Sequence, residues 1–486
     1  MTNFLIIFSV VYLTFMVGYA LFCWRSKAAS SNPSEFLFAG GNIGVFLAFL
    51  GISATLFSTF TLQGMPGFFK AHGIGAWIFL GVTDVCLAGL LLFFGLRLRE
   101  VARRFGNGAA TQSGNDGLPM NLAELIKRSG HGRGVILFYA LATTVFLIPY
   151  VTIQIKGASV LFQSAIPVGE THLFWSLIIV VLMLLYSTFG GIRAIFVTDA
   201  IQGIVLLVAA WAVAIFAIQG AGGVSKIFTD AAEASPALMS TPGPAGVLSW
   251  QFLVISFVSI SLMPYVQPQL ATRVLVARTD TTFVRATVGL AIFAILVIVP
   301  AIFIGLRGVV VSGESNDFLV NLLSGDVPPA FHALFIIGVV AAAMSTSDSQ
   351  LLAVGTEWGS SISRGSIERN PQARLLVKLT SIFVAIVALL LAQTSFESLI
   401  LFSVNSFIGT SFLLPIVYSV TVRSKVARGW LVALSVSSIF IFLLALFRVT
   451  PSAFGGIRVE LYLYLAIGLT IAVFQAINPR SPQTHG

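Results

Sequence analysis

The chain has 486 residues, of which 57% are hydrophobic and only 9% are charged. A soluble domain carries about 25% charged residues, so this composition excludes a soluble globular protein and predicts an integral membrane protein. The formal net charge of +9 does not indicate a nucleic-acid partner. Most of the 27 Lys and Arg residues lie in the loops expected on one side of a membrane, which makes them a topology signal.

Runs of about twenty apolar residues predict an all-α protein with about thirteen transmembrane helices. The first run has Arg25 and Lys27 after it and no basic residue before it, the reverse of a cleaved signal peptide, so we expect a retained span. The predicted spans are 3–24, 45–69, 74–96, 134–166, 172–190, 194–219, 248–264, 283–308, 331–358, 375–394, 396–421, 428–448 and 457–477.

Two of these divisions rest on short stretches. Gly190–Arg193 divides 172–219, and Gln393–Ser398 divides 375–421. The basic loops place the N-terminus outside and the C-terminus in the cytoplasm, as for a multi-pass protein of the inner (plasma) membrane surrounded by lipid. No sequence feature specifies an oligomeric state.

The segment Val339–Val354 is polar at its centre although it lies within an apolar span. Ser345, Asp348 and Ser349 are spaced i, i+3 and i+4, so they share one helix face. A carboxylate at this depth costs about 2.5–3.5 kcal/mol to insert and needs a partner. Hydroxyl and carboxylate oxygens suit a small hard cation, which predicts part of a cation site. The alternative is a polar seam between helices.

Two other spans carry signs of interruption. Span 45–69 holds many Ser and Thr residues and then Gly64–Gly67, and span 248–264 ends among Pro264 and Pro268. Interrupted spans are tolerated where they line a cavity, and a pair in corresponding positions is typical of inverted-repeat transporters. For 45–69, close packing of small residues is the alternative.

Three further charged residues lie inside predicted spans. Asp199 and Asp348 are expected at similar depth and could share cations, although Asp199 could instead stabilise a helix N-terminus. Lys156 could pair with Asp84, contact an anionic solute, or extend its ammonium group to the membrane surface.

Five segments occur in the order found in a known family: Glu35–Gly44, Gly64–Gly67, Gly190–Gln202, Gln267–Arg273 and Met344–Leu351. With these segments on thirteen spans, the chain resembles the sodium/solute symporter family. That family includes bacterial proline, pantothenate, monocarboxylate and sialic acid transporters and the animal glucose cotransporters.

The resemblance implies a leucine-transporter-like core of five plus five helices in inverted repeats. The extra N-terminal span would be 3–24, the repeats 45–219 and 248–421, and the two C-terminal spans 428–477, all in one transmembrane domain covering 1–486.

The resemblance also implies the binding residues. The main sodium site would use carbonyls of Ala54, Phe57 and Ala342 with the hydroxyls of Ser345 and Thr346. A second cation site, present in some members, would be formed by Asp199, Ser345, Asp348 and Ser349. Asp348 stands here where the sialic acid transporters have serine, so sodium or a proton could be the second ion. Ser58 and Thr61 match solute-contacting positions.

We therefore expect a secondary active transporter that couples sodium, or alternatively protons, to the uptake of a small organic solute. Lys156 favours a carboxylate or amino acid. A transport-inactive solute sensor of the same fold and a passive channel are the other readings. The chain has no arrangement of residues typical of an enzyme active site, and its histidines have no metal-ligand spacing.

Overall fold

The computed structural model describes residues 1–25, 42–106, 119, 121–312, 318–363, 370–394, 396–422 and 424–477. These residues are almost entirely helical, with one small hairpin of strands β1 (Ala453–Phe454) and β2 (Ile457–Arg458). The helices are α1 (Thr2–Arg25), α4 (Val45–Leu56), η2 (Phe60–Gly64), α5 (Met65–His72), η3 (Ile78–Val82), α6 (Thr83–Arg104), α7 (Leu122–Arg128), α8 (Arg133–Ala165), α9 (Leu173–Ala221), α10 (Val224–Ala234), η4 (Pro236–Met239), α11 (Trp250–Val266), α12 (Pro268–Val276), α13 (Asp280–Ser312), α14 (Phe318–Gly325), α15 (Pro329–Ile362), α16 (Pro371–Ala392), α17 (Phe396–Ser411), α18 (Leu414–Ser419), α19 (Lys425–Leu446) and α20 (Val459–Ile477).

Nine helices among the described residues are long and apolar enough to cross a membrane, and two bent pairs bring this number to eleven. Two shorter apolar segments, Leu173–Leu185 and Val404–Ser419, fall on further predicted spans. The prediction of an all-α integral membrane protein is therefore confirmed. The count of thirteen spans stays a prediction.

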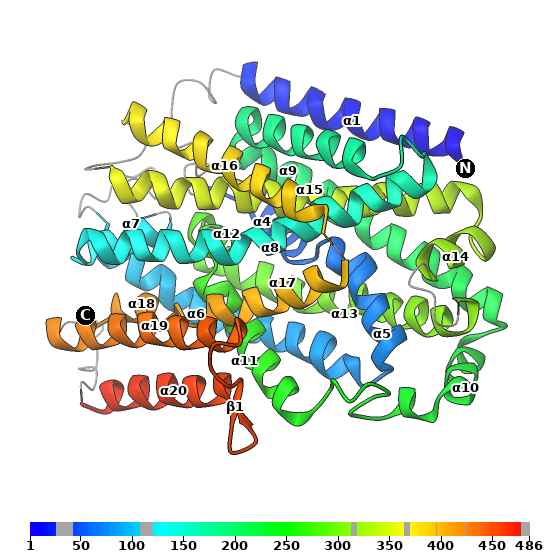
Figure 1. Cartoon of the computed structure of the whole chain (residues 1–486). Coiled ribbons are helices and arrows are strands. Elements are labelled where there is room, and N and C mark those ends of the chain that lie inside the picture. The colour runs from blue at the N-terminus through cyan, green and yellow to red at the C-terminus, as the bar shows by residue number, and fades with distance from the viewer. Residues whose placement is uncertain are drawn as a thin grey trace.

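Helix α15 forms the centre of the protein (Figure 1). Of its most apolar window, 83% is buried inside the protein, against 17% for the windows of α1 and α20, which lie at the edges. α15 packs against α8, α9, α16 and α1. Its neighbour α16 runs antiparallel to it, with Ser381 Oγ donating to the carbonyl of Leu351 at 2.9 Å. The polar segment predicted from the sequence thus lies on the most enclosed of the nine long apolar helices described.

Helix α9 is a single helical element over the two predicted spans 172–190 and 194–219. At 1.5 Å per residue its 49 residues would reach about 74 Å, more than twice the hydrocarbon thickness of a bilayer. Its two ends nevertheless lie at the same end of the α15–α16 pair. His172 Nε2 is 3.2 Å from the carbonyl of Ala392 at the end of α16, while the Gly220 carbonyl accepts from Arg307, which pairs with Asp326 just before α15 begins. The chain therefore reverses within α9, and the predicted division at 190–193 falls mostly on residues whose side chains are not described.

Both predicted interruptions are present as bends. Val45–Leu56 and Phe60–His72 meet at 56°, and Trp250–Val266 and Pro268–Val276 meet at 53°. At the first break Phe57 is extended, with φ −91° and ψ 112°. At the second, Gln267 is extended and Pro268 follows it, so this position lacks the N–H that would continue the helix.

The two broken spans are joined at the end of the protein predicted to be cytoplasmic. The backbone N–H of Ile43 donates to the carbonyl of Val276, and the N–H of Arg278 donates to the carbonyl of Ile43. Arg99 of α6 adds to this closure, because it donates to the Val274 carbonyl and to Asp280 Oδ1, both at 2.7 Å. The segment that leads into α4 and the end of α12 are therefore held together. The residues 26–41, with most of the predicted motif Glu35–Gly44, lie outside the described residues.

The short helix α7 covers the same end. The backbone N–H groups of Leu122 and Ala123 donate to the buried carboxylate of Glu357 on α15 at 3.1 and 2.6 Å, and Asn121 Nδ2 donates to Ser360 Oγ at 2.9 Å. Three contacts thus fix α7 to the last turns of the central helix.

Replacing the buried Arg99 tests this closure. Arg99→Gln should lower the apparent free energy of unfolding in SDS by roughly 2 kcal/mol, because hydrogen bonds to charged groups contribute about 1.5–3 kcal/mol. Arg103 pairs with the same Asp280 but is 49% exposed, so Arg103→Gln should cost less than about 1 kcal/mol. Equal effects of the two substitutions would contradict the closure described here.

Candidate functional site

The last turn of α4 meets the centre of α15 through hydroxyl groups. Ser345 Oγ donates to the carbonyl of Ala54 at 2.8 Å and to the carbonyl of Ala342 at 3.1 Å. Thr346 Oγ1 donates to the carbonyl of Thr55 at 3.3 Å. All of these residues are buried. Four residues predicted for the main sodium site are thereby brought together around one contact between two helices.

Phe57, the fifth predicted residue, lies at the break itself, and its ring centroid is 5.6 Å from that of Phe293. Close to the break, the buried hydroxyls of Ser53 and Thr55 have no hydrogen-bond partner among the described residues. Carbonyl and hydroxyl oxygens in a dry setting are the donors that small hard cations prefer. The residues present therefore fit a sodium ion.

Helix α8 supports both breaks. Tyr150 Oη donates to the carbonyl of Leu56 at 3.3 Å, and Tyr139 Oη donates to the carbonyl of Val266 at 3.0 Å. Each carbonyl belongs to the last residue before a break. The two tyrosines are about three helical turns apart and therefore share one face of α8. Gln154 Oε1 accepts from the N–H of Thr59, where the chain resumes after the first break. The backbone groups freed by the breaks are thus satisfied inside the protein, as a membrane interior requires.

The residues predicted for a second cation site also come together, around Arg273 of α12. Its Nη2 is 2.5 Å from Asp199 Oδ2 and also donates to Ser349 Oγ. Ser349 Oγ donates in turn to Asp348 Oδ1 at 3.3 Å. Asp199 and Asp348 are fully buried, and Arg273 is 3% exposed. The positive charge at this cluster is supplied by the chain itself.

The sequence did not predict that Arg273 would pair with these acids. Its guanidinium stacks on Phe196, with 4.5 Å between Cζ and the ring centroid, and the absence of a side chain at Gly51 leaves room for both. A Cβ at Gly51 would come within 2.8 Å of Arg273 Nη1. A small cavity of about 20 Å³, room for about one water molecule, adjoins the cluster and is lined partly by Gln269, Thr272, Arg273 and Ser349. Two features of the sequence could have indicated its role. An arginine follows the proline-broken span closely, and Asp199 and Asp348 lie in apolar segments where each needs a partner.

Ser58 and Thr61, the predicted solute-contacting residues, cap the helix that follows the first break. Ser58 Oγ accepts from the N–H of Phe60 at 3.2 Å, and Thr61 Oγ1 accepts from the N–H of Ser58 at 3.0 Å. This is the reciprocal arrangement of a capping box, with Thr in place of the usual Glu or Gln. Both hydroxyls use their oxygen as acceptor, so each O–H group remains to donate.

Lys156 does not form the predicted bridge to Asp84 among the described residues. Its ammonium group donates to the carbonyl of Thr394, just beyond the end of α16, where a cation satisfies a terminal carbonyl. Gln154, two residues earlier, faces the break, so Lys156 projects from nearly the opposite face of α8. No ion pair joins Lys156 to Asp84 among the described residues. The predicted bridge is therefore wrong, and the solute contact of Lys156 stays a prediction.

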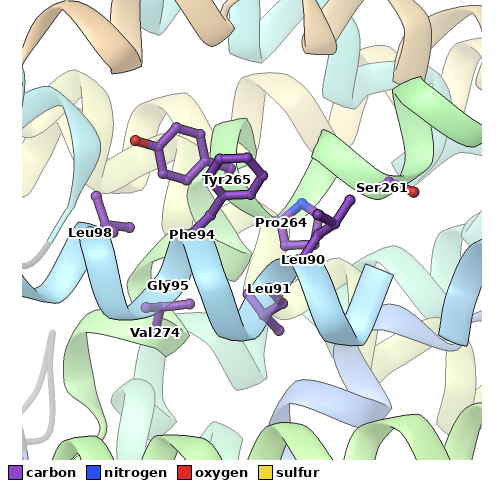
Figure 2. Close-up of a pocket in the computed structure, with 9 residues that line it drawn as sticks. All are labelled: Leu90, Leu91, Phe94, Gly95, Leu98, Ser261, Pro264, Tyr265 and Val274. Carbon is purple, nitrogen blue, oxygen red and sulfur yellow. The ribbon is translucent and has the colours of Figure 1, made fainter. Parts of the chain in front are cut away.

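A narrow apolar crevice, with no room for a water molecule, lies between α6 and the second broken span (Figure 2). The rings of Phe94 and Tyr265 lie side by side in it, with centroids 5.0 Å apart. The other lining residues are Leu90, Leu91, Gly95, Leu98, Ser261, Pro264 and Val274. This lining is almost wholly apolar and includes none of the predicted solute-contacting residues, so the crevice is part of the packing between α6 and the second broken span.

Removing one tyrosine hydroxyl tests the support of the breaks. Tyr150→Phe and Tyr139→Phe should each lower the free energy of unfolding by about 1–3 kcal/mol, because each leaves a buried carbonyl without its donor. Tyr462→Phe is the control, since that hydroxyl bonds the Phe454 carbonyl at an exposed position, and it should change stability by less than about 0.5 kcal/mol. The support would be disproved if all three variants unfolded alike.

Two bacterial transporters are similar to this chain in sequence. The sodium/pantothenate symporter of Escherichia coli (strain K12) is 24% identical over 470 residues, which cover 94% of this chain and 93% of that protein. The high-affinity proline transporter PutP of Bacillus subtilis (strain 168) is 26% identical over 377 residues, 75% of this chain and 76% of that protein.

Among solved structures, the substrate-bound outward-open state of a Na⁺-coupled sialic acid symporter superposes with a TM-score of 0.75. The identity is 18%, and the match covers 98% of this chain and 97% of that one, so the likeness shows a shared fold. The fold is the leucine-transporter type of sodium-coupled transporters. The model of the sodium:solute symporter family matches residues 36–437. The chain therefore belongs to the sodium:solute symporter family, a family of membrane transporters.

Proposed function

We propose that this protein takes up a small organic solute together with sodium by alternating access. The observation that carries the proposal is the contact of Ser345 Oγ with the carbonyl of Ala54. It joins a broken span to the central helix through oxygens that suit sodium. Ala54, Phe57, Ala342, Ser345 and Thr346 are the proposed ligands of the coupling ion.

Sodium stabilises one arrangement of the protein because its ligands come from two elements. An ion held by α4 and α15 together favours the state in which those helices are close, and a ligand shifts a conformational equilibrium only through such a difference in affinity. Solute then binds between the two broken spans. Rocking of one helical bundle against the other opens the end at which Ile43 and Val276 are now joined.

The proposed repeats are 45–219 and 248–421, each beginning with a broken span. The nearly equal bends of 56° and 53° support this division. The proposed orientation has the N-terminus outside and the C-terminus in the cytoplasm, because the basic loops lie at one end. In Figure 1 the start of α1 and the end of α20 lie at opposite ends of the protein, as an odd number of crossings requires.

The proposed solute is a carboxylate or an amino acid. Pantothenate and proline, which the relatives carry, both contain a carboxylate. The N-terminus of α12, which begins at Pro268 without a side-chain cap, adds a partial positive charge at the second break. Uncapped half-helix N-termini at the membrane centre attract anionic solute groups. The hydroxyls of Ser58 and Thr61 are the proposed polar contacts at the first break.

The number of coupled ions sets the largest solute gradient that the transporter can maintain. One charge crossing 100 mV supplies about 2.3 kcal/mol, and a tenfold gradient adds about 1.4 kcal/mol. One sodium ion thus supports a solute gradient of several hundredfold, and two support a gradient on the order of 10⁵-fold.

The double substitution Ser345→Ala with Thr346→Ala tests the ion ligands. Removing two hydroxyl ligands should raise the sodium concentration at half-maximal uptake by at least about tenfold, equivalent to about 1.4 kcal/mol. Ser361→Ala is a matched control on the same helix, since that hydroxyl bonds only its own helix at Trp358. An unchanged sodium dependence in the double variant would refute the assigned ligands.

A thermal-shift screen with and without sodium tests the solute class. A compound that binds only the folded protein stabilises it by about 2.7 kcal/mol at one hundred times its dissociation constant. Proline, pantothenate and other small carboxylates should raise the melting temperature more in sodium than in potassium. Stabilisation by neutral sugars alone would contradict the proposed class, and counterflow of the compound found would then separate a carrier from a sensor.

A further inference from the structure

Helix α1 lies outside both proposed repeats, and most of its surface faces away from the rest of the protein. Only 17% of its apolar window is buried. The buried residues Leu5, Tyr12 and Met16 lie on one narrow face, along which α1 packs against α9 and α15. Tyr12 is near the middle of the helix and is 8% exposed. A hydroxyl at that depth needs partners inside the protein, because hydrocarbon supplies none.

The Tyr12 hydroxyl joins two other helices. It accepts from Gln202 Nε2 of α9 at 2.7 Å and donates to Met344 Sδ of α15 at 3.5 Å. Gln202 is fully buried, and its other described hydrogen bond is to Met16 Sδ at 3.8 Å, a weak acceptor. Its Oε1 has no partner among the described residues. Tyr12 is therefore the main partner of a buried amide.

The residue that follows each of these two partners lies against Ala54. Ser345 follows Met344 and donates to the Ala54 carbonyl at 2.8 Å. Gly203 follows Gln202, and a Cβ built on it would lie 3.3 Å from the Cβ of Ala54. Ala54 is thus enclosed between α9 and α15, and the hydroxyl from α1 bonds both of these helices at the same level.

We propose that Tyr12 is a positioning residue for the main sodium site. It holds α9 and α15 at the spacing in which the oxygens of Ala54 and Ser345 face the ion. The inference rests on the proposed function, because it assumes that the coupling ion binds at these oxygens. It extends that function to α1, a helix that supplies no ligand of its own.

Removing the hydroxyl would leave the Gln202 amide without a strong acceptor in a place that hydrocarbon surrounds. The nearest strong acceptors along the two helices are buried carboxylates. Asp199 lies one turn from Gln202 on α9, and Asp348 lies one turn from Met344 on α15. An amide drawn towards either acid would move one wall of the site. The arrangement that binds sodium would then be less favoured, and the apparent affinity for the ion would fall.

Equilibrium binding of radioactive sodium to the purified full-length protein tests the proposal without a known solute. Tyr12→Phe keeps the ring and removes only the hydroxyl. It should raise the dissociation constant for sodium about two- to tenfold, the range expected for the loss of one buried hydrogen bond.

Tyr464→Phe is the matched control. Tyr464 belongs to α20, which also lies outside the proposed repeats, and its hydroxyl is 2.7 Å from Ser411 Oγ on α17. This substitution should lower the melting temperature but leave the dissociation constant for sodium unchanged, because neither helix carries a proposed sodium ligand. Equal weakening of sodium binding by both substitutions would show a general loosening of the protein and would overturn the proposal.

The Gln202→Leu variant removes the same hydrogen bond from its other partner. Sodium binding by the double variant Tyr12→Phe with Gln202→Leu should be no weaker than that of the weaker single variant, because the second change has no bond left to break. Additive losses would mean that the two residues act separately, which contradicts the proposal.

The outcomes separate this proposal from the proposed function. Folded Tyr12→Phe that binds sodium as tightly as the wild-type protein, or more tightly, would overturn the positioning role and leave the proposed function standing. No sodium bound by the wild-type protein would overturn the proposed function itself. If Tyr12→Phe does not fold, Gln202→Leu alone decides, and an unchanged sodium affinity in that variant would overturn the positioning role.

Discussion

The hydrogen bond from Ser345 to the carbonyl of Ala54 is the contact on which the rest of the arrangement depends. A helix that stops inside a membrane leaves carbonyls without partners, and hydrocarbon cannot supply them. Here the partners come from two neighbouring helices: hydroxyls of α15 reach the last turn of α4, while Tyr150 of α8 reaches the carbonyl of Leu56. The break is therefore stable only because α4, α8 and α15 lie together. The same carbonyl oxygens could exchange these hydrogen bonds for contacts with an ion, while the hydroxyls keep their protons and turn their oxygens towards it.

Several buried polar atoms near the first break and around Arg273 have no hydrogen-bond partner among the described residues. They include Asp348 Oδ2, Arg273 Nη1 and the hydroxyl of Ser53. Such groups are expensive in a folded protein, by about 1–3 kcal/mol each. Many of them lie where α4, α9, α12 and α15 meet, and others, such as those of Ser256 and Ser438, lie on α11 and α19. Stability is thus given up locally at the place where we propose that the ion and the solute bind.

The sequence was sufficient for those features that are local along the chain. Proline, glycine and hydroxyl residues predicted both breaks, and the spacing of Ser345, Asp348 and Ser349 predicted their common face, because a helix fixes such relations by its period. Contacts between side chains that lie far apart in the sequence could not be predicted. Lys156 bonds the end of α16 instead of Asp84, and Arg273 meets Asp199 only because α12 is turned by the break before it. The reversal within α9 was predicted from a glycine pair, although the helical hydrogen bonding continues through it.

Hydrogen exchange of the purified protein, compared in sodium and in potassium, tests the central contact most directly. An ion held between α4 and α15 should slow exchange of the backbone amides in two separate segments, 53–61 and 342–349, over the same range of sodium concentration. Potassium at equal ionic strength should leave both unchanged. Protection of one segment alone, or of neither, would contradict a coupling ion shared by the broken span and the central helix.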